Sequence, residues 1–213
     1  PQGNASTGLG VVEDQRSPTL YNLLTTGKFD PTAVKKTKIP NLHIITANTD
    51  LAASEIELAE LENRENRLKN ILNNITNYDY IFIDCPPALG LLTINGLVAA
   101  NSVLVPMQCE FFALEGLTSL TQTIKSIKEN FNNNLEIEGL ILTMHDKRNT
   151  LSELVEQDVR GHFGKKVFKT IIPRNVRVSE APSHGKPVLV YDTTCVGSKA
   201  YIELAKEVIF NQW

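Results

Sequence analysis

Residues 102–108 (SVLVPMQ) and 135–144 (LEIEGLILTM) are the two stretches that decide the fold. Both are apolar, rich in branched residues and nearly continuous, which is typical of strands buried on both faces. The stretch between them, LEGLTSLTQTIKSIKENF (114–131), has a helical pattern. A strand, a helix and a second strand in this order predict a βαβ unit, in which the sheet is parallel and covered by helices.

The same alternation continues on either side of this unit. Further strands are predicted by LHIITA (42–47), YIFIDCP (80–86) and VFKTIIP (167–173). Further helices are predicted over 51–75, 89–100, 151–162 and 197–210, the first with a capping-box spacing at Ser54 and Glu57. No internal repeat, low-complexity stretch or linker interrupts the chain. We therefore expect a single α/β domain over residues 1–213, with a mostly parallel sheet and helices on both faces.

Composition favours a soluble globular protein. The 213 residues are 42% hydrophobic and 21% charged, and no long uncharged apolar run predicts a membrane span. The three cysteines, Cys85, Cys109 and Cys195, have no CxxC spacing, so neither a disulfide framework nor a zinc site is expected. This cysteine usage favours a cytoplasmic location.

Charge is unevenly distributed along the chain. Residues 147–186 contain nine lysines and arginines against four acidic residues, a balance of +5, whereas the whole chain has a net charge of −3. The remaining residues therefore carry −8. A basic segment in an acidic protein indicates a polyanion partner, although a solvated surface face is an equally good explanation from charge alone.

Ligands of parallel sheets bind beyond the carboxyl ends of the strands, so the residues there are candidate site residues. Asp84 is the first charge after the apolar run 80–83. A carboxylate in this place can hold the water shell of Mg²⁺, which takes one or two carboxylates and keeps several waters. The alternative is an Asp that caps a helix in a tight turn.

Two other strand ends carry weaker candidates. Cys109 has no histidine close to it in sequence, so a buried structural thiol is favoured over a nucleophile. His145 and Asp146 suggest acid–base chemistry, but a loop histidine beside an aspartate is more often incidental. Neither Cys109 nor the pair of His145 and Asp146 predicts a catalytic site by itself.

The loop IPRNVRVSEAPSHGKPV (172–188) is restricted by Pro173 and Pro182 near its two ends. Asn175 offers a donor and an acceptor side by side, which matches the edge of an adenine. Arg174 and Arg177 lie three residues apart and suit phosphate groups. The first ten residues, PQGNASTGLG, hold three glycines and no charge, and they suit either a loop that faces a ligand or a free tail.

Taken together, these segments closely resemble the ParA/Soj chromosome- and plasmid-partitioning ATPases, the deviant-Walker-A group of P-loop NTPases that also includes MinD. The resemblance runs from Pro1 to about Ile209, in family order and spacing. It rests on PQGNASTGLG (1–10), YDYIFIDCPPALGLLTINGLVAA (78–100), VPMQCEFFALEGL (105–117), LILTMHDKRNTL (140–151) and IIPRNVRVSEAPSHGKPV (171–188).

The resemblance assigns nucleotide and metal roles. Gln2, Gly3 and Asn4 would belong to the loop that senses the γ-phosphate of ATP, and Asp84 would end the Walker B strand and hold Mg²⁺ through water. The aspartate that supports hydrolysis in the family directly precedes this loop, so it would lie before Pro1. No catalytic residue is therefore expected within the 213 residues.

The resemblance also assigns the base and DNA contacts. Pro173 and Asn175 would lie beside the adenine, with Thr143 and Met144 at the neighbouring strand end. Arg148 and Arg177 match family positions implicated in DNA binding, and both fall inside the basic segment. They would contact the phosphate backbone, which gives affinity with little choice of sequence.

The chain departs from the family in one respect, because the P-loop of the form KGGVGKT is absent from the 213 residues. This loop supplies the backbone cradle, the lysines for phosphate and a hydroxyl for Mg²⁺. We expect it upstream, with the first strand, the first helix and the second strand. Without them we expect no ATP hydrolysis, unpaired strand edges, exposed apolar faces and a poorly anchored segment 1–10.

For the complete protein, the resemblance implies a nucleotide-gated switch at the nucleoid. ATP and Mg²⁺ would promote a homodimer that binds DNA non-specifically, and a ParB-type partner would stimulate hydrolysis and reset the switch. One alternative is a non-catalytic remnant that binds DNA or a partner subunit. A MinD-like membrane-positioning ATPase is a second, but the end IELAKEVIFNQW is short and not basic, despite Phe210 and Trp213.

Overall fold

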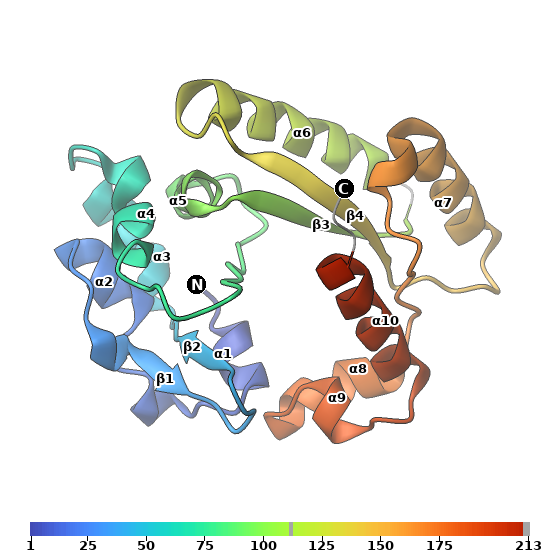
Figure 1. Ribbon diagram of the computed structural model, residues 1–213, viewed down its shortest axis with the longest axis horizontal. Helices are drawn as coiled ribbons and strands as arrows, with labels where there is room; N and C mark the ends of the chain where they lie inside the picture. The colour runs from blue at the N-terminus through green and yellow to red at the C-terminus, as the bar shows by residue number, and fades with distance from the viewer. Residues whose placement is uncertain (111–112, 211–213) are drawn as a thin grey trace. The chain divides into compact units, whose positions relative to one another are not determined.

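The structure is a computed structural model that describes residues 1–110 and 113–210 (Figure 1). The described residues divide into two compact units. The first contains residues 1–100 together with 182–186, and the second contains residues 101–181 and those from 187 onward. Whether the chain behaves as the single domain predicted from sequence stays a prediction.

The first unit consists mainly of short helices and one small sheet. Its elements are α1 (Asn4–Gly8), η1 (Glu13–Gln15), α2 (Leu20–Thr26), η2 (Pro31–Ala33), β1 (Val34–Lys36), β2 (His43–Ile45), α3 (Asp50–Leu58), η3 (Arg64–Asn66), α4 (Arg67–Leu72) and α5 (Leu91–Ala99). Strands β1 and β2 pair antiparallel, with Val34 opposite Ile45. The prediction of a strand in 42–47 is thus confirmed in its central part.

The core of the first unit lies between α2, α3, α4 and α5, which contact one another in pairs. Its buried members are Leu23, Leu24, Ala33, Leu51, Leu58, Leu68, Ile71 and Leu92. Local signals fix the ends of α2, since Thr19 and Asn22 form a capping box and Gly27 closes the helix at φ 68°. The buried Asn95 side chain accepts from Leu68 N–H and donates to the Arg64 carbonyl, which ties α5 to α4.

Residues 182–186 belong to the first unit although they lie far along the chain. Gly10 and Gly185 meet backbone to backbone, with φ values of 75° and 60°. A Cβ on Gly10 would lie 2.7 Å from the Gly185 carbonyl oxygen, so any larger residue would force the two segments apart. This contact packs residues 182–186 against residues 1–10.

The long helix predicted over 51–75 is instead broken into α3, η3 and α4. Asn63 adopts a left-handed conformation at φ 52°, which an α-helix does not accommodate. The capping box at Ser54 and Glu57 is wrong, because α3 already begins at Asp50 and the buried Ser54 hydroxyl donates to the Leu51 carbonyl. The polar stretch 59–66 therefore separates two short helices.

Residues 80–86, which are all among the described residues, do not form the predicted strand. Residues 80–86 have no regular structure, and the side chains of Tyr80 and Phe82 are 56% and 75% exposed. An apolar run becomes a strand only where partner strands satisfy its backbone groups. The unpaired segment agrees with the expectation of exposed apolar surface.

The second unit contains the βαβ unit that the sequence predicts. Its elements are β3 (Ser102–Gln108), α6 (Ala113–Asn130), β4 (Glu136–Thr143), α7 (Thr150–Phe163), η4 (Gly164–Lys166), α8 (Val176–Glu180), α9 (Val188–Tyr191) and α10 (Val196–Phe210), while η5 (Ala181–His184) passes from the second unit into the first. Strands β3 and β4 pair parallel, from Ser102 opposite Glu136 to Gln108 opposite Thr143. Figure 1 shows α6 running back beside these strands.

Both faces of this parallel pair are covered, as predicted. Leu140 and Leu142 of β4 face a core that includes Leu117 of α6 and Val155 of α7. The intervening Ile141 faces the opposite side and packs with Phe168, Ile172 and Leu204, the last from α10. Alternate residues of one apolar run thus fill two separate cores, which explains the continuous hydrophobic pattern.

The predicted strand 167–173 runs beside β4 but forms only isolated bridges. Leu140 pairs parallel with Val167, and His145 pairs parallel with Pro173. The Glu207 carboxylate accepts hydrogen bonds from the N–H groups of Lys169 and Thr170, so α10 satisfies part of this segment's backbone. These bonds take the place of a regular ladder along its outer edge.

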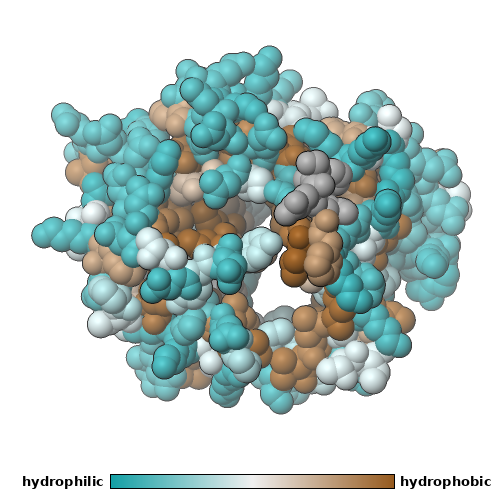
Figure 2. All heavy atoms as spheres, viewed as in Figure 1, coloured by the Kyte–Doolittle hydropathy of each residue, from teal (hydrophilic) through white to brown (hydrophobic). Residues whose placement is uncertain are grey.

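Apolar side chains also reach the surface. Figure 2 shows hydrophobic residues visible among hydrophilic ones on the face that it draws. The most exposed of the large hydrophobic residues include Ile56, Phe82, Val176 and Phe210. No helix among the described residues combines the length and apolarity that crossing a membrane would require, and Trp213 lies outside the described residues.

Candidate functional site

The segment 1–10 forms a turn and a short helix rather than a free tail. Gly3 precedes α1 in the left-handed conformation, at φ 71°, and the buried Ser6 hydroxyl accepts a 3.1 Å hydrogen bond from Ala47 N–H. Arg16 donates to the Thr7 hydroxyl at 2.9 Å and to the Ala47 carbonyl at 3.3 Å. The expectation of a poorly anchored segment is therefore wrong, because bonds to residues after β2 replace the support of a preceding strand.

One cavity of the first unit unites two groups of predicted site residues. It has a volume of about 620 Å³, and its lining includes Gln2, Gly3 and Asn4 from the N-terminal loop and Asp84 from the segment after residue 83. These residues are about eighty positions apart in sequence. The cavity is large enough for a ligand of nucleotide size.

Asp84 is an exposed carboxylate at the edge of this cavity, directly before Cys85 and the proline pair 86–87. Among residues 1–110 and 113–210, no three His, Cys, Asp or Glu side chains gather in a way that could hold a metal ion. A single exposed carboxylate fits Mg²⁺ held through water, and it does not fit a tightly ligated zinc or calcium ion.

The second unit brings together the four residues predicted to lie beside the adenine. Thr143 ends β4, and Met144 follows in a left-handed conformation at φ 55°. His145 then bonds on both sides of Pro173, since His145 N–H donates to the Ile172 carbonyl at 3.2 Å and its own carbonyl accepts from Arg174 N–H at 2.9 Å. The strand end and the loop are thus fixed side by side.

Asn175 completes this group with a structural task of its own. Its side-chain oxygen accepts a 3.3 Å hydrogen bond from Val178 N–H and so caps α8. Gly197 of α10 packs closely here, because a Cβ on it would lie 2.5 Å from the Val178 side chain and 3.4 Å from that of Asn175. The cap commits the oxygen of Asn175 and fixes the orientation of its amide.

Arg148 is exposed and held by a neighbouring carboxylate. Its guanidinium donates to both oxygens of Asp146, at 3.0 and 2.8 Å, while the arginine side chain remains 88% exposed. These hydrogen bonds lower the pKa of Asp146 well below its usual range and raise that of Arg148. The arrangement presents a fixed cation on the loop after β4.

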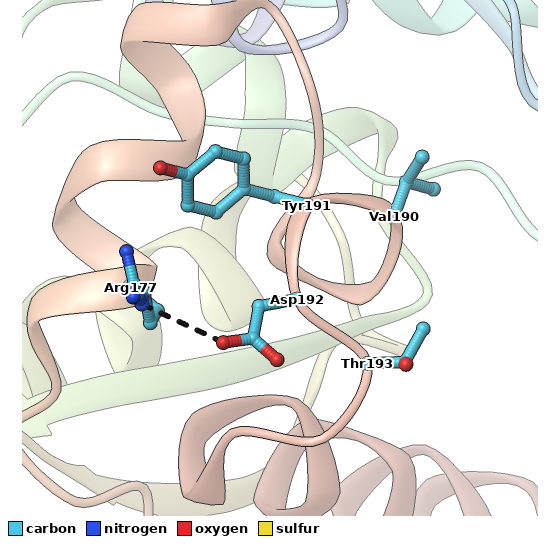
Figure 3. Close-up of a pocket in the computed structure, with 5 residues that line it drawn as sticks. All are labelled: Arg177, Val190, Tyr191, Asp192 and Thr193. Atoms are coloured by element: carbon cyan, nitrogen blue, oxygen red, sulfur yellow. Dashed lines mark ion pairs between the residues drawn. The ribbon is translucent and has the colours of Figure 1, made fainter.

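Arg177 lies in α8 and contacts two carboxylates, of which Figure 3 draws Asp192. Its side chain pairs with Glu180 at 3.0 Å and with Asp192 at 3.5 Å, and it is 53% exposed. Together with Tyr191 and Thr193 it lines an open pocket of about 480 Å³. Hydrogen bonds from Thr194 lower the pKa of Asp192, so this carboxylate stays charged beside the arginine.

Sequence reasoning missed the partners that hold these groups in place. Arg16 braces the N-terminal loop, and Glu156 lies 3.3 Å from the buried His145 ring while it also pairs with Arg160 at 2.8 Å. Each of these contacts joins residues that are at least four positions apart, and no motif marks them. Their charges are the only signal that the sequence offers.

Comparison with known proteins tests the family resemblance that the motifs predict. A family model described as an AAA domain matches residues 1–137. The chromosome partitioning protein ParA of Caulobacter vibrioides is 54% identical over 212 residues, which cover 98% of this chain and 79% of that protein. The chain belongs to the ParA/Soj family of chromosome-partitioning ATPases. The resemblance predicted from the motifs is thereby confirmed.

A second relative and a solved structure extend the match. The sporulation initiation inhibitor protein Soj of Bacillus subtilis is 49% identical over 99% of this chain and 84% of its own length. A crystal structure of cobyrinic acid a,c-diamide synthase from Mycobacterium smegmatis, with bound ADP and magnesium, matches with a TM-score of 0.82 and 31% identity, over 98% of this chain and 78% of that chain. The predicted P-loop NTPase-like α/β fold is confirmed.

Proposed function

We propose that this ParA/Soj chain, in a form that also carries the P-loop, acts as an ATP-dependent switch in the segregation of DNA. The observation that carries the proposal is the shared cavity, because Gln2, Gly3 and Asn4 line it together with Asp84. Backbone groups of a short loop beside an exposed carboxylate suit a phosphate with its Mg²⁺. The family relationship supports the same assignment.

The roles within the nucleotide site are those that the family resemblance implies. Gln2, Gly3 and Asn4 approach the γ-phosphate, and Asp84 orients the water shell of Mg²⁺, which neutralises phosphate charge when bound. Thr143, Met144, Pro173 and Asn175 contact the adenine, where the remaining amide hydrogens of Asn175 serve as donors. ATP stabilises a homodimer only insofar as it binds that state more tightly.

The DNA contacts are electrostatic. Arg148 and Arg177 neutralise backbone phosphates in the dimer, so binding has little sequence preference and weakens with salt. A ParB-type protein stimulates hydrolysis and thereby returns the protein to a state of low DNA affinity. These steps place the protein in the cytoplasm, at the nucleoid.

An arginine substitution tests the DNA assignment. The protein for this test is a P-loop-bearing form, in which the family's upstream segment with KGGVGKT precedes Pro1, loaded with ATP. Arg177→Ala should weaken binding to duplexes of unrelated sequence to the same degree, and the slope of log affinity against log salt should fall by about 1. Fluorescence anisotropy over a range of salt measures both quantities.

A matched control is Arg64→Ala, since Arg64 is also partly exposed and paired with a carboxylate, Glu65 at 3.1 Å, but lies outside the basic segment 147–186. This variant should bind DNA as the parent does. If Arg177→Ala binds every duplex as tightly as the parent does, the assignment of Arg177 to the DNA surface is wrong.

A further inference from the structure

Arg16 occupies a central place beside the N-terminal loop. Its guanidinium donates three hydrogen bonds, from Nε to the Val11 carbonyl at 3.1 Å, from Nη1 to the Ala47 carbonyl at 3.3 Å and from Nη2 to the Thr7 hydroxyl at 2.9 Å. Thr7 lies in α1, Val11 follows that helix, and Ala47 lies just after the end of β2. Only the planar fork of arginine reaches acceptors in three directions at once.

The backbone of Arg16 is fixed as firmly as its side chain. The Thr46 hydroxyl, which is completely buried, donates a 2.7 Å hydrogen bond to the Arg16 carbonyl. Thr46 in turn accepts from Leu20 N–H at the start of α2 through its own carbonyl, at 2.8 Å. Arg16 is thus joined to the end of β2 from both its main chain and its side chain.

Gly3 packs directly against this arrangement. A Cβ on Gly3 would lie 2.7 Å from Nη1 of Arg16 and 2.9 Å from the Ala47 carbonyl oxygen, at a φ of 71° that side chains rarely adopt. The turn that contains Gln2, Gly3 and Asn4 therefore packs against the Arg16 guanidinium and the Ala47 carbonyl, which are hydrogen-bonded to each other. A shift of the Arg16 guanidinium would remove a group against which this turn packs.

We propose that Arg16 is the positioning residue of the γ-phosphate loop, holding Gln2, Gly3 and Asn4 in the cavity that they share with Asp84. This inference rests on the proposed function, since it assigns Arg16 a purpose in nucleotide recognition. A loop that distinguishes one phosphate must be placed to within about 1 Å, because small displacements of binding groups greatly weaken recognition. Arg16 meets that need from outside the cavity, with no contact of its own to the ligand.

The first measurement uses the 213-residue chain itself. Hydrogen exchange should be followed at the amides of Thr7 and Val11, which bond to the carbonyls of Gly3 and Ser6 at 3.0 Å. In Arg16→Ala these amides should exchange at least about tenfold faster, because three hydrogen bonds that hold the segment are lost. Arg16→Lys should give an intermediate rate, since one ammonium group cannot satisfy all three acceptors.

Arg67→Ala is the matched control. Arg67 also donates to two backbone carbonyls, those of Leu24 and Thr25, at 2.6 and 2.9 Å, but it braces α2 rather than the loop. Its loss should speed exchange in α2 and leave Thr7 and Val11 close to the wild-type rate. Unchanged exchange of Thr7 and Val11 in Arg16→Ala would overturn the positioning role.

The second measurement addresses the purpose, in the P-loop-bearing form. The affinity for a non-hydrolysable ATP analogue relative to that for ADP should fall by about tenfold in Arg16→Ala and stay constant in Arg67→Ala. A constant ratio in Arg16→Ala overturns the link to the γ-phosphate. If the parent binds neither nucleotide, the proposed function fails, and the exchange data still decide whether Arg16 positions the loop.

Discussion

The thiol of Cys109 lies at the carboxyl end of β3, in the core that α6 and α7 cover, and it is 3% exposed. Burial, followed by the Glu156 carboxylate, raises its pKa to about 11. The thiolate is the reactive form, and a pKa near 11 leaves roughly a hundredfold less of it than an ordinary thiol has at neutral pH. The interpretation of Cys109 as a structural rather than nucleophilic residue agrees with this environment.

This burial predicts selective alkylation. At pH 8, iodoacetamide should modify the exposed Cys85 while Cys109 stays unmodified in the folded chain. In denaturant both should react, because the pKa of Cys109 then returns to its ordinary value. Mass spectrometry of peptides measures the two sites separately. Rapid labelling of Cys109 without denaturant would contradict the structure.

At the level of single residues, sequence reasoning proposed the groups that would face ligands and missed the contacts that hold them in place. Asp84 and Asn175 follow apolar runs, so they could be picked out as candidates directly from the sequence, although neither run forms a regular strand. Arg16 bonds to Ala47 across 31 positions. A contact of that kind depends on how two segments pack, and neither segment contains a local pattern that records it.

Among the elements, the strand pair β3 and β4 was predicted correctly because both of its faces are buried by this chain's own helices. The apolar run 80–86 looks similar in sequence but is not a strand here. Its side chains Tyr80 and Phe82 remain exposed, so the pattern alone did not decide the outcome. Apolarity signals that a segment can be buried, and pairing partners determine whether it becomes a strand.

The junction of α10 with the segment 167–173 depends on Glu207. Burial disfavours its charged form, but the N–H donors of Lys169 and Thr170 prevail and lower its pKa. A carboxylate with a lowered pKa in the folded state stabilises the fold above its unfolded pKa, near 4, and loses that contribution as pH falls. Glu207 therefore contributes at neutral pH, and its contribution declines as pH falls through its lowered pKa.

Replacing this carboxylate tests the junction. Glu207→Ala should lower the free energy of unfolding at pH 7 by about 1 kcal/mol, a value reduced for partial solvent screening. The difference from wild type should shrink as pH falls through the pKa of Glu207. Urea unfolding at pH 7 and pH 3 measures it. Glu203→Ala is the control, since Glu203 pairs with Lys206 on the surface of the same helix. An equal loss at both pH values would show that charge is not responsible.

For the whole molecule, we predict that hydrolysis requires the P-loop, which is absent from the 213 residues. The sequence includes Asp84 and the loop that we propose to approach the γ-phosphate, but no KGGVGKT segment. The backbone cradle and lysines of that loop bind the phosphates, and electrostatic stabilisation of this kind supplies most of the rate in phosphoryl transfer. We therefore predict that the 213-residue chain alone does not hydrolyse ATP.

A phosphate-release assay with Mg²⁺ and increasing ATP checks this prediction. The 213-residue chain should give no saturable turnover above background, and the P-loop-bearing form should give slow turnover that depends on Mg²⁺. A contaminating ATPase is excluded if Asp84→Ala abolishes the activity of the P-loop-bearing form. Saturable turnover by the shorter chain would show that its own residues suffice.

The contact between Gly10 and Gly185 has a consequence for how the protein is made. Residues 182–186 complete the first unit, yet they are synthesised about 86 residues after its main part ends at Ala100. At translation rates of about 5–20 residues per second, the ribosome adds this stretch in roughly 4–17 seconds. During that time the Gly10 backbone of the nascent first unit lacks its contact with Gly185. The latest-made segment of this unit thus packs against the turn at Gly10.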